Sequence, residues 1–431
     1  MRLIYSLPFF PYAYTPWLFR EMAWMRQRGH EIAVISLDDP PGPSADLREF
    51  KLHDVPVLQL RMRHTSDARL LRELVTLGAG WLAPAPVSLA ALRRQKGLRQ
   101  GVHEWQTLKR AAAFVRRFKA DVIEAHWAAH SAALARDLMR ATGISYALRM
   151  HGGDLHTNPS PNLQVLVESA AAVCPVSRFL ADLLLGQRPL PNLPPVPPVS
   201  FDLKKLRICH NGVPADAIAA EPAPQSDDLQ IVGTIGRLDP PKRHGELVTA
   251  VARLAPKHPG LRLLIIGGGV LEEQLKQQAA DLGIADRVTV TGLLSWDKVI
   301  EARKQLHIYA HTSQLEGCSL AVAEGLAQGV PGLLTRVGAA VDSIEEGVNG
   351  YTVAVGDVDA ITASLDKLVS AGAEARRQMG AVSIRIIRQR FEFDGVMTRL
   401  ESILHAVARH EALPEDAVIP SAGGPSHPGV G

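Results

Sequence analysis

Two acidic residues bracket a run of small and apolar residues in the segment EGCSLAVAE, which begins at Glu316 and ends at Glu324. If the whole segment were helical, the two glutamate backbones would lie about 12 Å apart, at a rise of 1.5 Å per residue. A retaining glycosidase needs its paired carboxyl groups only roughly 5 Å apart, so the spacing does not suit a nucleophile and acid pair. A carboxylate can instead accept two hydrogen bonds from a vicinal diol. The spacing favours one elongated ligand held at two hydroxyl-bearing places. An ordinary ion pair is the alternative for each glutamate separately, but it explains the pair poorly.

Basic side chains gather in the segment GRLDPPK, where Gly236, Arg237 and Lys242 follow an expected strand at 229–235. An arginine can grip phosphate oxygens with its planar guanidinium, and a lysine adds a point charge. Two cations at the carboxyl end of a strand favour a diphosphate ligand. The alternative is a surface loop whose cations form ordinary salt bridges.

A helix of small and apolar residues is expected at 320–328, with Ser319 as its natural N-cap. The amides of the turn before it then lie at the positive end of the helix, where anions and oxygens bind. These amides belong to Gly317, Cys318, Ser319 and Leu320. We therefore expect an anion and oxygen cradle beside the first glutamate.

Among the 16 histidines, His151 has the most suggestive position, because it opens a Gly-Gly turn directly after an expected strand at 145–150. It could donate a hydrogen bond to sugar hydroxyls or to a backbone carbonyl, with Asp154 three residues further on. The pair His126 and His130 in HWAAH has a spacing that can form a zinc face on a helix, but the glutamate of H-E-x-x-H is missing. We expect no metal there.

Short apolar runs alternate with helical patterns in both halves of the chain, which indicates βαβ units and parallel sheets. The sequence predicts an α/β fold of two Rossmann-like doubly wound domains facing across a cleft, with ligands at the carboxyl ends of the strands. The expected strands are 2–6, 31–37, 121–125, 145–150, 229–235, 261–266, 287–291, 308–311 and 330–335, and a terminal amphipathic helix is expected at 391–409.

Composition sets the expected domain limits. An N-terminal domain at 1–213 precedes a linker at 214–228, which is rich in Pro, Ala and Asp. A second domain at 229–388 is followed by a C-terminal helix at 389–410. The tail at 411–431 is rich in Pro, Gly and Ser, so we expect it to be disordered.

The 431 residues are 46% hydrophobic and 21% charged, and no apolar run reaches the roughly 18 residues that a membrane-spanning helix needs. Three scattered cysteines offer no disulfide framework and favour a reducing compartment. We expect a soluble, cytoplasmic protein.

The segment at 93–119 contains nine basic residues and only one acidic residue, a glutamate. They predict either a solvated helix face or contact with an anionic surface, such as the inner face of a membrane or a phosphate-bearing acceptor. No nucleic-acid motif accompanies them.

Taken together, these motifs resemble the retaining GT-B glycosyltransferases of family four, the glycosyl transferases group 1. The E-x7-E element from Glu316 to Glu324 is the most specific of them. VGAAVDSIEEGVNGYTV at 337–353 is similar to the pattern that follows it in the family. The family's G-R-x-x-x-x-K, N-G-V and H-G motifs are at 236–242, 211–213 and 151–152.

The resemblance implies a sugar donor activated by a nucleoside diphosphate, which is a co-substrate rather than a cofactor, and no metal. The second domain would bind this donor, the first would serve the acceptor, and the C-terminal helix would return to the first domain. Arg237 and Lys242 would hold the diphosphate. Glu316 with the amides of 317–320 would hold the sugar, and Glu324 the ribose hydroxyls.

The resemblance further implies front-face attack by an acceptor hydroxyl as the diphosphate departs, with electrostatic stabilisation and retention of the anomeric configuration. His151 would reach the donor sugar from the side of the first domain. The residues assigned to catalysis are His151, Glu316, Arg237 and Lys242, and those assigned to the acceptor side are Tyr14, Thr15 and Asp154.

Two positions depart from the family pattern. PFFPYAYTPWLFRE at 8–21 replaces the usual Gly-Gly turn, and Asp342 replaces a glutamate. The first departure is closer to members that build bacterial exopolysaccharides or lipid-linked oligosaccharides, which favours a hexosyltransferase acting on a sugar or lipid-linked acceptor. A nucleotide-sugar epimerase and a non-catalytic nucleotide-sugar-binding protein are the alternatives. A Rossmann dehydrogenase is disfavoured, because Gly267-Gly268-Gly269 is not the G-x-G-x-x-G fingerprint.

Overall fold

The computed structural model describes residues 1–13, 15–61, 98–156, 159–187, 196 and 198–415. Its contacts divide the chain into two compact units. Unit 1 consists of Met1–Pro175, Leu183–Arg207 and Arg399–Pro414, and unit 2 contains Val176–Asp182 and Ile208–Thr398. Each unit contains one six-stranded sheet.

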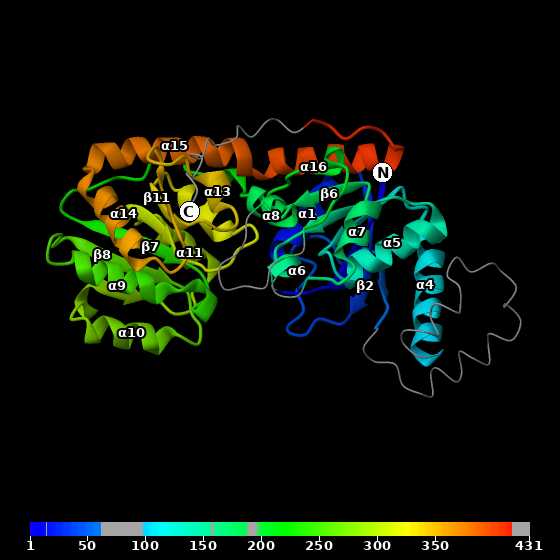
Figure 1. Cartoon of the computed structure of the whole chain (residues 1–431), viewed down its shortest axis with the longest axis horizontal. Helices are drawn as coiled ribbons and strands as arrows, with labels where there is room; N and C mark the ends of the chain where they lie inside the picture. Colours follow the sequence, from blue (N-terminus) through cyan, green and yellow to red (C-terminus); the bar gives the residue numbers. More distant parts are fainter. Residues whose placement is uncertain (14, 62–97, 157–158, 188–195, 197, 416–431) are drawn as a thin grey trace, which may run out of the picture. The chain divides into compact units, whose positions relative to one another are not determined.

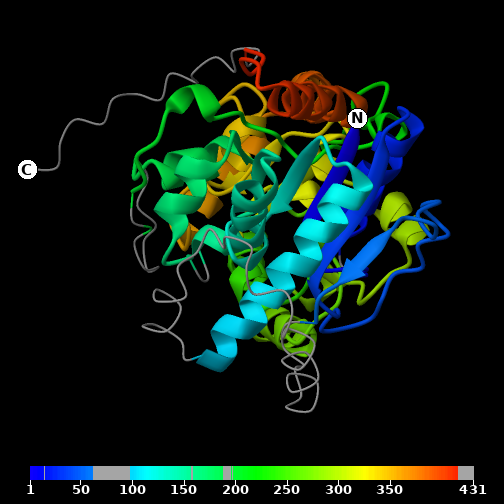
Figure 2. The ribbon, with the colours of Figure 1, turned by 90° about the vertical axis from the view of Figure 1, so that its right-hand side faces the viewer.

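The sheet of unit 1 is parallel throughout, in the order β3-β2-β1-β4-β5-β6. Its central strands are buried almost along their whole length, as expected for a sheet covered on both faces. The strands are β1 (Arg2–Phe9), β2 (Glu31–Asp38), β3 (Val57–Gln59), β4 (Val122–His126), β5 (Tyr146–Met150) and β6 (Ala172–Pro175). The helices are α1 (Pro16–Gln27), α4 (Leu98–Phe118), α5 (His130–Thr142), α6 (Gly153–His156) and α7 (Leu163–Ser169), and α8 (Arg178–Leu184) follows β6. Figure 2 shows α4 in cyan, and it packs against α5.

The sheet of unit 2 has the order β12-β11-β10-β7-β8-β9 and is also parallel. Figure 1 labels three of its strands, β7, β8 and β11. The strands are β7 (Gln230–Ile235), β8 (Leu261–Ile266), β9 (Val288–Val290), β10 (Ile308–His311), β11 (Gly332–Thr335) and β12 (Gly350–Val353). The helices are α9 (His244–Leu254), α10 (Glu272–Asp281), α11 (Trp296–Arg303), α12 (Leu320–Leu326), α13 (Ala340–Ser343), α14 (Val358–Ser370) and α15 (Ala373–Phe391). The predicted α/β fold with two parallel sheets is confirmed.

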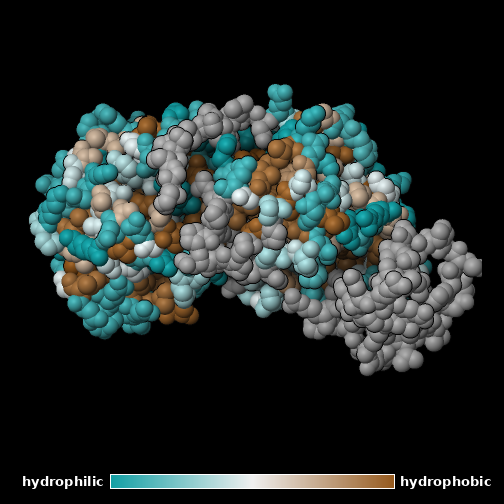
Figure 3. Space-filling model, viewed as in Figure 1, coloured by the Kyte–Doolittle hydropathy of each residue, from teal (hydrophilic) through white to brown (hydrophobic). Residues whose placement is uncertain are grey.

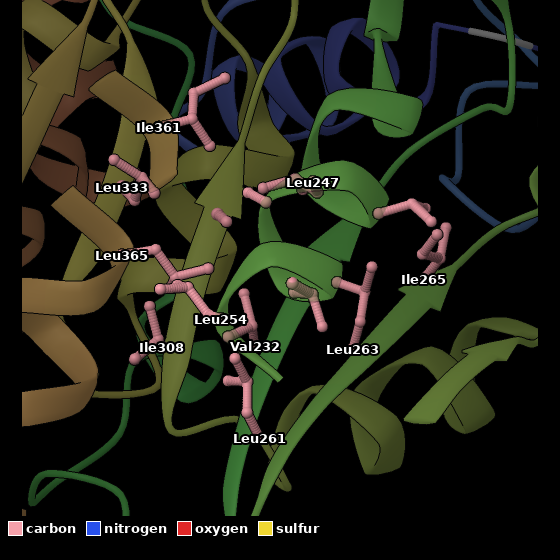
Figure 4. Close-up of a cluster of buried hydrophobic side chains, with 14 of the residues drawn as sticks. Val232, Leu247, Leu254, Leu261, Leu263, Ile265, Ile308, Leu333, Ile361 and Leu365 are labelled. Atoms are coloured by element: carbon pink, nitrogen blue, oxygen red, sulfur yellow. The ribbon is translucent and has the colours of Figure 1, made fainter. Parts of the chain in front are cut away.

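Hydrophobic clusters cover both faces of the unit 2 sheet. Side chains alternate between the faces of a strand, so Leu263 and Ile265 of β8 join one cluster and Ile266 joins the other. The first cluster packs the sheet against α9, α10 and α14 (Figure 4). The second packs it against α12, α13 and α15. Helices on both faces make this unit doubly wound, and they hold the strand ends in fixed register.

The terminal helix predicted at 391–409 is confirmed as α16 (Phe393–Arg409), but a second helix, α15, ends directly before it. Glu392 between them is extended, and the amides of Val213 and Phe393 donate to Phe391 O and Val213 O at 2.7 and 2.9 Å. Gly212 makes this approach possible, because a Cβ there would lie 2.6 Å from the Phe393 Cα. Residues of α16 up to Thr398 belong to unit 2, and those from Arg399 belong to unit 1.

Hydrophilic and hydrophobic residues are interspersed on the face drawn in Figure 3. Among the described residues, no helix combines the length and the apolar character that crossing a bilayer requires.

Candidate functional site

The order of strands in unit 2 creates a switch point between β7 and β10. The chain adds β8 and β9 on one side of β7 and then returns to place β10 on the other side. In open α/β sheets, ligands bind outside the carboxyl ends of the strands at such a point, because the connections run in opposite directions. The loops after β7 and β10 are residues 236–242 and 312–319, which contain the cations and the first glutamate that the sequence singled out.

Hydrogen bonds join these two loops. The Thr312 hydroxyl donates to the carbonyl oxygens of Lys242 and Arg243 at 3.3 and 3.1 Å. The amide of Gln314 donates to Pro241 O at 2.7 Å. The two loops therefore hold each other in place, and Lys242 is fixed near the segment that carries Glu316.

Glu316 and Lys242 meet in this site, as the sequence suggested they should if they served one ligand. The Lys242 ammonium lies 2.5 Å from Glu316 Oε1, and the same oxygen lies 2.8 Å from Nε2 of His311, the last residue of β10. Burial raises the pKa of Glu316, but the hydrogen bond and charge of His311, followed by those of Lys242, outweigh it and lower the pKa to about 2. Glu316 is therefore a carboxylate at neutral pH, and its Oε1 is held by the Lys242 ammonium and by Nε2 of His311.

Gly338 supports Glu316 from the loop after β11. Its φ of +54° lies in the left-handed region, and a Cβ there would lie 2.6 Å from the Glu316 Cβ. Only glycine fits both conditions without strain. The glycine of the VGAA segment thus allows the backbone of this loop to lie close to Glu316.

The turn at 317–320 leads into α12. Ser319 is its N-cap residue, although the Ser319 side chain caps no amide of the helix. Among the described residues, the amides of Gly317 and Leu320 donate to no protein acceptor. These donors lie beside Glu316 in the chain and are suited to an anionic or oxygen-rich ligand.

Glu324 and Arg237 have other surroundings. Glu324 is buried in α12, with its Oε2 3.6 Å from NH1 of the equally buried Arg303 of α11. Burial lowers the pKa of Arg303, although Glu324 counteracts this effect. The Arg237 side chain is 79% exposed and pairs with Asp239 at 3.1 Å. The structure therefore brings Lys242 and Glu316 together directly, and gives Glu324 a cation of its own.

Unit 1 repeats the topological pattern, with its switch point between β1 and β4. His126 ends β4, and His151 follows the neighbouring strand β5. Nδ1 of His126 lies 2.9 Å from Nε2 of His151, and their rings are nearly parallel, at 8°, with centroids 5.1 Å apart. Trp17 and Trp127 flank the His151 ring at centroid distances of 4.6 and 4.7 Å. His151 thus lies in an aromatic cluster and remains partly exposed.

Asp154 shapes this region through its backbone contacts. Its Oδ1 accepts hydrogen bonds from the amides of His151 and Gly152 at 3.2 and 2.8 Å, and its Oδ2 accepts one from Ala128 at 2.8 Å. The carboxylate therefore ties the turn after β5 to the turn after β4. Thr15 is the N-cap residue of α1, and its hydroxyl donates to Tyr12 O at 2.8 Å. Tyr14 lies outside the described residues.

Two groups of side chains in the described residues have the composition of metal ligands: His30, Glu401 and His405, and Glu21, Glu124 and His126. In the first group, Arg28 lies 3.1 Å from Glu401. In the second, Arg149 lies 3.8 Å from each glutamate. An arginine thus already supplies positive charge in both groups. The HWAAH pair forms no helical zinc face, because His126 belongs to β4 and His130 begins α5.

Several residues of these sites were not identified from the sequence. His311 is the last residue of a predicted strand, and this position at the carboxyl end of the strand is a signal by which it could have been found. His126 was considered only as a metal ligand. Trp17 and Trp127 carry no spacing signal, because their contacts with His151 bring together distant parts of the chain.

Two family models match the chain. "Glycosyl transferases group 1" matches residues 218–384, and "Glycosyl transferase 4-like domain" matches residues 17–197. The chain therefore contains a glycosyl transferases group 1 domain and a glycosyl transferase 4-like domain. The chain is 29% identical over 174 residues to a GDP-mannose-dependent alpha-(1-6)-phosphatidylinositol monomannoside mannosyltransferase of Mycolicibacterium smegmatis, a match that covers 37% of the chain and 46% of the relative. It is 31% identical over 230 residues to a D-inositol 3-phosphate glycosyltransferase of Stackebrandtia nassauensis, covering 51% of each. The matches span about half or less of these relatives' own length.

Solved structures share the fold of this protein over nearly the whole chain. A glycosyltransferase from Rickettsia africae aligns with a TM-score of 0.70 and 16% identity, covering 95% of this chain and 99% of the other. Anabaena HepE in complex with UDP and glucose aligns with a TM-score of 0.63 and 17% identity, covering 94% and 100%. The fold is therefore the GT-B fold of these glycosyltransferases.

Proposed function

We propose that the protein is a retaining, metal-independent hexosyltransferase that moves a sugar from a nucleoside-diphosphate sugar to an acceptor hydroxyl in bacterial polysaccharide or glycolipid assembly. The observation that carries this proposal is the pairing of Glu316 with Lys242 and His311 at the switch point of unit 2. A carboxylate held beside a cation provides an acceptor for sugar hydroxyls next to a partner for phosphate.

In this proposal, the diphosphate displaces the Lys242 ammonium from Glu316, and the exposed Arg237 turns toward the same phosphates. Glu316 is then free to accept hydroxyl hydrogen bonds of the sugar, while the amides of 317–320 donate to its oxygens. Glu324 takes the ribose hydroxyls, and His151 contacts the sugar. Lys242 and Arg237 stabilise the negative charge that develops on the leaving diphosphate.

The names of the compared proteins support a donor of this class. The Mycolicibacterium relative is described as GDP-mannose-dependent, and HepE was solved with UDP and with UDP-glucose. Both relatives are named for an inositol-containing acceptor, which agrees with a phosphate-bearing or lipid-linked acceptor here. We propose the same broad classes for this chain.

Thermal shift with UDP-, GDP- and ADP-sugars tests the donor assignment, because a ligand that binds only the native state raises its melting temperature. We expect one nucleotide class to raise the Tm of the wild type, and Lys242→Ala and Arg237→Ala to lose most of that rise. Arg253→Ala removes an exposed ion pair with Asp359 and serves as the matched control. An unchanged rise in the Lys242 and Arg237 variants would refute the diphosphate assignment.

Product analysis tests the reaction itself. With donor and an acceptor sugar, we expect a glycoside with the anomeric configuration of the donor, formed equally in the presence of EDTA. Conversion of the donor to an epimer without an acceptor would support the epimerase alternative. Donor binding without turnover of any kind would support the non-catalytic alternative.

We also propose that the basic segment at 93–119 contacts an anionic membrane surface. Residues 93–97 lie outside the described part of the chain, but α4 and the residue after it expose Lys109, Arg110, Arg116, Arg117 and Lys119. Each cation near anionic lipid gains about 1 kcal/mol, so the double reversal K109E/R110E should weaken vesicle binding roughly tenfold or more. Co-sedimentation with phosphatidylglycerol vesicles measures this effect, with Lys304→Glu in unit 2 as the control. Equal binding of K109E/R110E and wild type would contradict the proposal.

A further inference from the structure

A chain of polar groups leads from the interior of unit 1 to His151. His126 is fully buried, with Nδ1 2.9 Å from His151 Nε2 on one side. On the other side, its Nε2 lies 3.6 Å from Glu124 Oε1 and 3.7 Å from Glu21 Oε1. The His126 ring therefore separates the carboxylates from the His151 ring.

The groups around this ring come from every neighbouring element. Glu21 lies on α1, Glu124 on β4, Arg149 on β5 and Tyr5 on β1. All of them are buried, and Arg149 lies 3.8 Å from each glutamate. Two carboxylates and one guanidinium in a dry interior leave one excess negative charge, unless the carboxylates bind a proton. Burial raises the pKa of Glu21, which agrees with a proton kept on the carboxylate pair.

His126 is neutral in this environment, because burial first, and then the charges of His151 and Arg149, lower its pKa well below the ordinary value. A neutral imidazole carries one N–H and one lone pair. The proton kept on the carboxylate pair lies in the hydrogen bond between Glu21 and Glu124, so a lone pair on Nε2 would face two carboxyl oxygens at less than 4 Å, an unfavourable arrangement. With the N–H on Nε2, the ring points its positive edge at those oxygens. Nδ1 then bears the lone pair and accepts from His151.

The geometry points to His126 as a positioning residue that fixes the tautomer of His151. His151 donates its Nε2 proton to His126 Nδ1, so the remaining ring nitrogen of His151, Nδ1, presents a lone pair. We propose that this nitrogen accepts a hydrogen bond from a hydroxyl of the bound ligand. The sequence alone led us to expect that His151 could donate to sugar hydroxyls or to a backbone carbonyl, and this inference makes it an acceptor instead.

The identity of the hydroxyl as part of a sugar rests on the proposed function, whereas the tautomer does not. Trp17 and Trp127 flank the His151 ring and orient it, so the lone pair has a fixed direction. Asp154 holds the backbone amide of His151 from behind. These contacts hold the His151 ring in the orientation that keeps the hydrogen bond from its Nε2 to Nδ1 of His126.

Long-range 1H–15N spectra of the full chain with 15N-labelled histidine rings test the inference. His151→Asn and His126→Asn assign the two rings by loss of signals, and His258→Asn, at a separate ion pair with Asp366, is the control. We expect a proton on Nε2 and none on Nδ1 of His151 between pH 6 and 8, with nitrogen coupling across the hydrogen bond to His126. In His126→Leu, we expect the His151 signals to shift toward an average of both tautomers.

A proton on His151 Nδ1, or a proton bonded to His126 Nδ1, in the wild type would overturn the inference. The wild-type spectrum alone gives this answer even if His126→Leu does not fold. Unchanged His151 signals in a folded His126→Leu variant would equally overturn it, since His126 would then have no positioning role. The spectra require no sugar donor. A failure of nucleotide-sugar binding in the thermal shift experiment would therefore refute the proposed function while the tautomer is still measured.

Discussion

Glu316→Gln should destabilise unit 2 in a way that depends on pH. The surroundings of Glu316 lower its pKa from the ordinary value of 4.5 to about 2. Each pKa unit corresponds to about 1.4 kcal/mol, so the charged form contributes about 3 kcal/mol to the free energy of unfolding at pH 7. Because the folded-state pKa is depressed, this contribution is complete above pH 4.5 and is lost as the pH falls toward 2. At pH 3, less than half of it should remain.

Urea unfolding of wild type and Glu316→Gln at pH 7 and pH 3 measures this difference. His311 has a larger effect than Lys242 on the pKa of Glu316, so His311→Leu should reduce the pH-dependent term more than Lys242→Met. Glu374→Gln, which removes an exposed ion pair with Arg377, should behave like the wild type at both pH values. If Glu316→Gln equalled the wild type at pH 7, or differed from it by the same amount at both pH values, Glu316 would not be the held carboxylate described above.

Three further substitutions probe the packing around the sites. Gly338→Ala should lower the free energy of unfolding by about 1–2 kcal/mol, because alanine is strained in the left-handed region. The added Cβ should also displace Glu316, so donor binding should fall more than stability. Thermal shift with and without nucleotide sugar would show both effects. Arg149→Met leaves two buried glutamates without their cation and should cost about 3–5 kcal/mol, with the loss in urea unfolding larger at pH 8 than at pH 5 because protonation relieves it. Gly325→Ala places a Cβ 2.3 Å from the Tyr309 ring, and calorimetry should show a loss of about 1–3 kcal/mol; a variant as stable as the wild type would refute the tight packing.

Local patterns in the sequence were sufficient for much of unit 2. Five of its strands are short apolar runs bounded by glycine or polar residues, and their predicted limits differ from the observed ones by at most two residues, whereas β12 was not predicted. Since parallel strands end at one edge of a sheet, the predicted strand ends already implied that Lys242 and Glu316 would share that edge. The partner of Glu324 was not predictable, because Arg303 lies well before it in the sequence and forms no local pattern with it. Only the packing of α11 brings Arg303 to Glu324.

In unit 1, the surroundings of the candidate residues could not be predicted from the sequence. His151 was singled out because it follows a predicted strand, but its environment depends on residues from α1, β4 and β5. Glu21 reads as one polar position of an amphipathic helix, and nothing in its spacing indicates burial beside Glu124. Buried charges of this kind are energetically unfavourable alone and become intelligible only when their partners are placed in space.

The division of α16 between the units has a consequence for the order in which the protein can fold. Leu400, Ile403 and Leu404 are fully buried and belong to unit 1, whose sheet is formed by residues far earlier in the chain. During synthesis, the whole sheet of unit 2 therefore leaves the ribosome before the part of α16 that completes the core of unit 1. Until then, unit 1 exposes the apolar surface that Leu400, Ile403 and Leu404 cover in the folded protein. Exposed apolar surface of this kind is what chaperones bind.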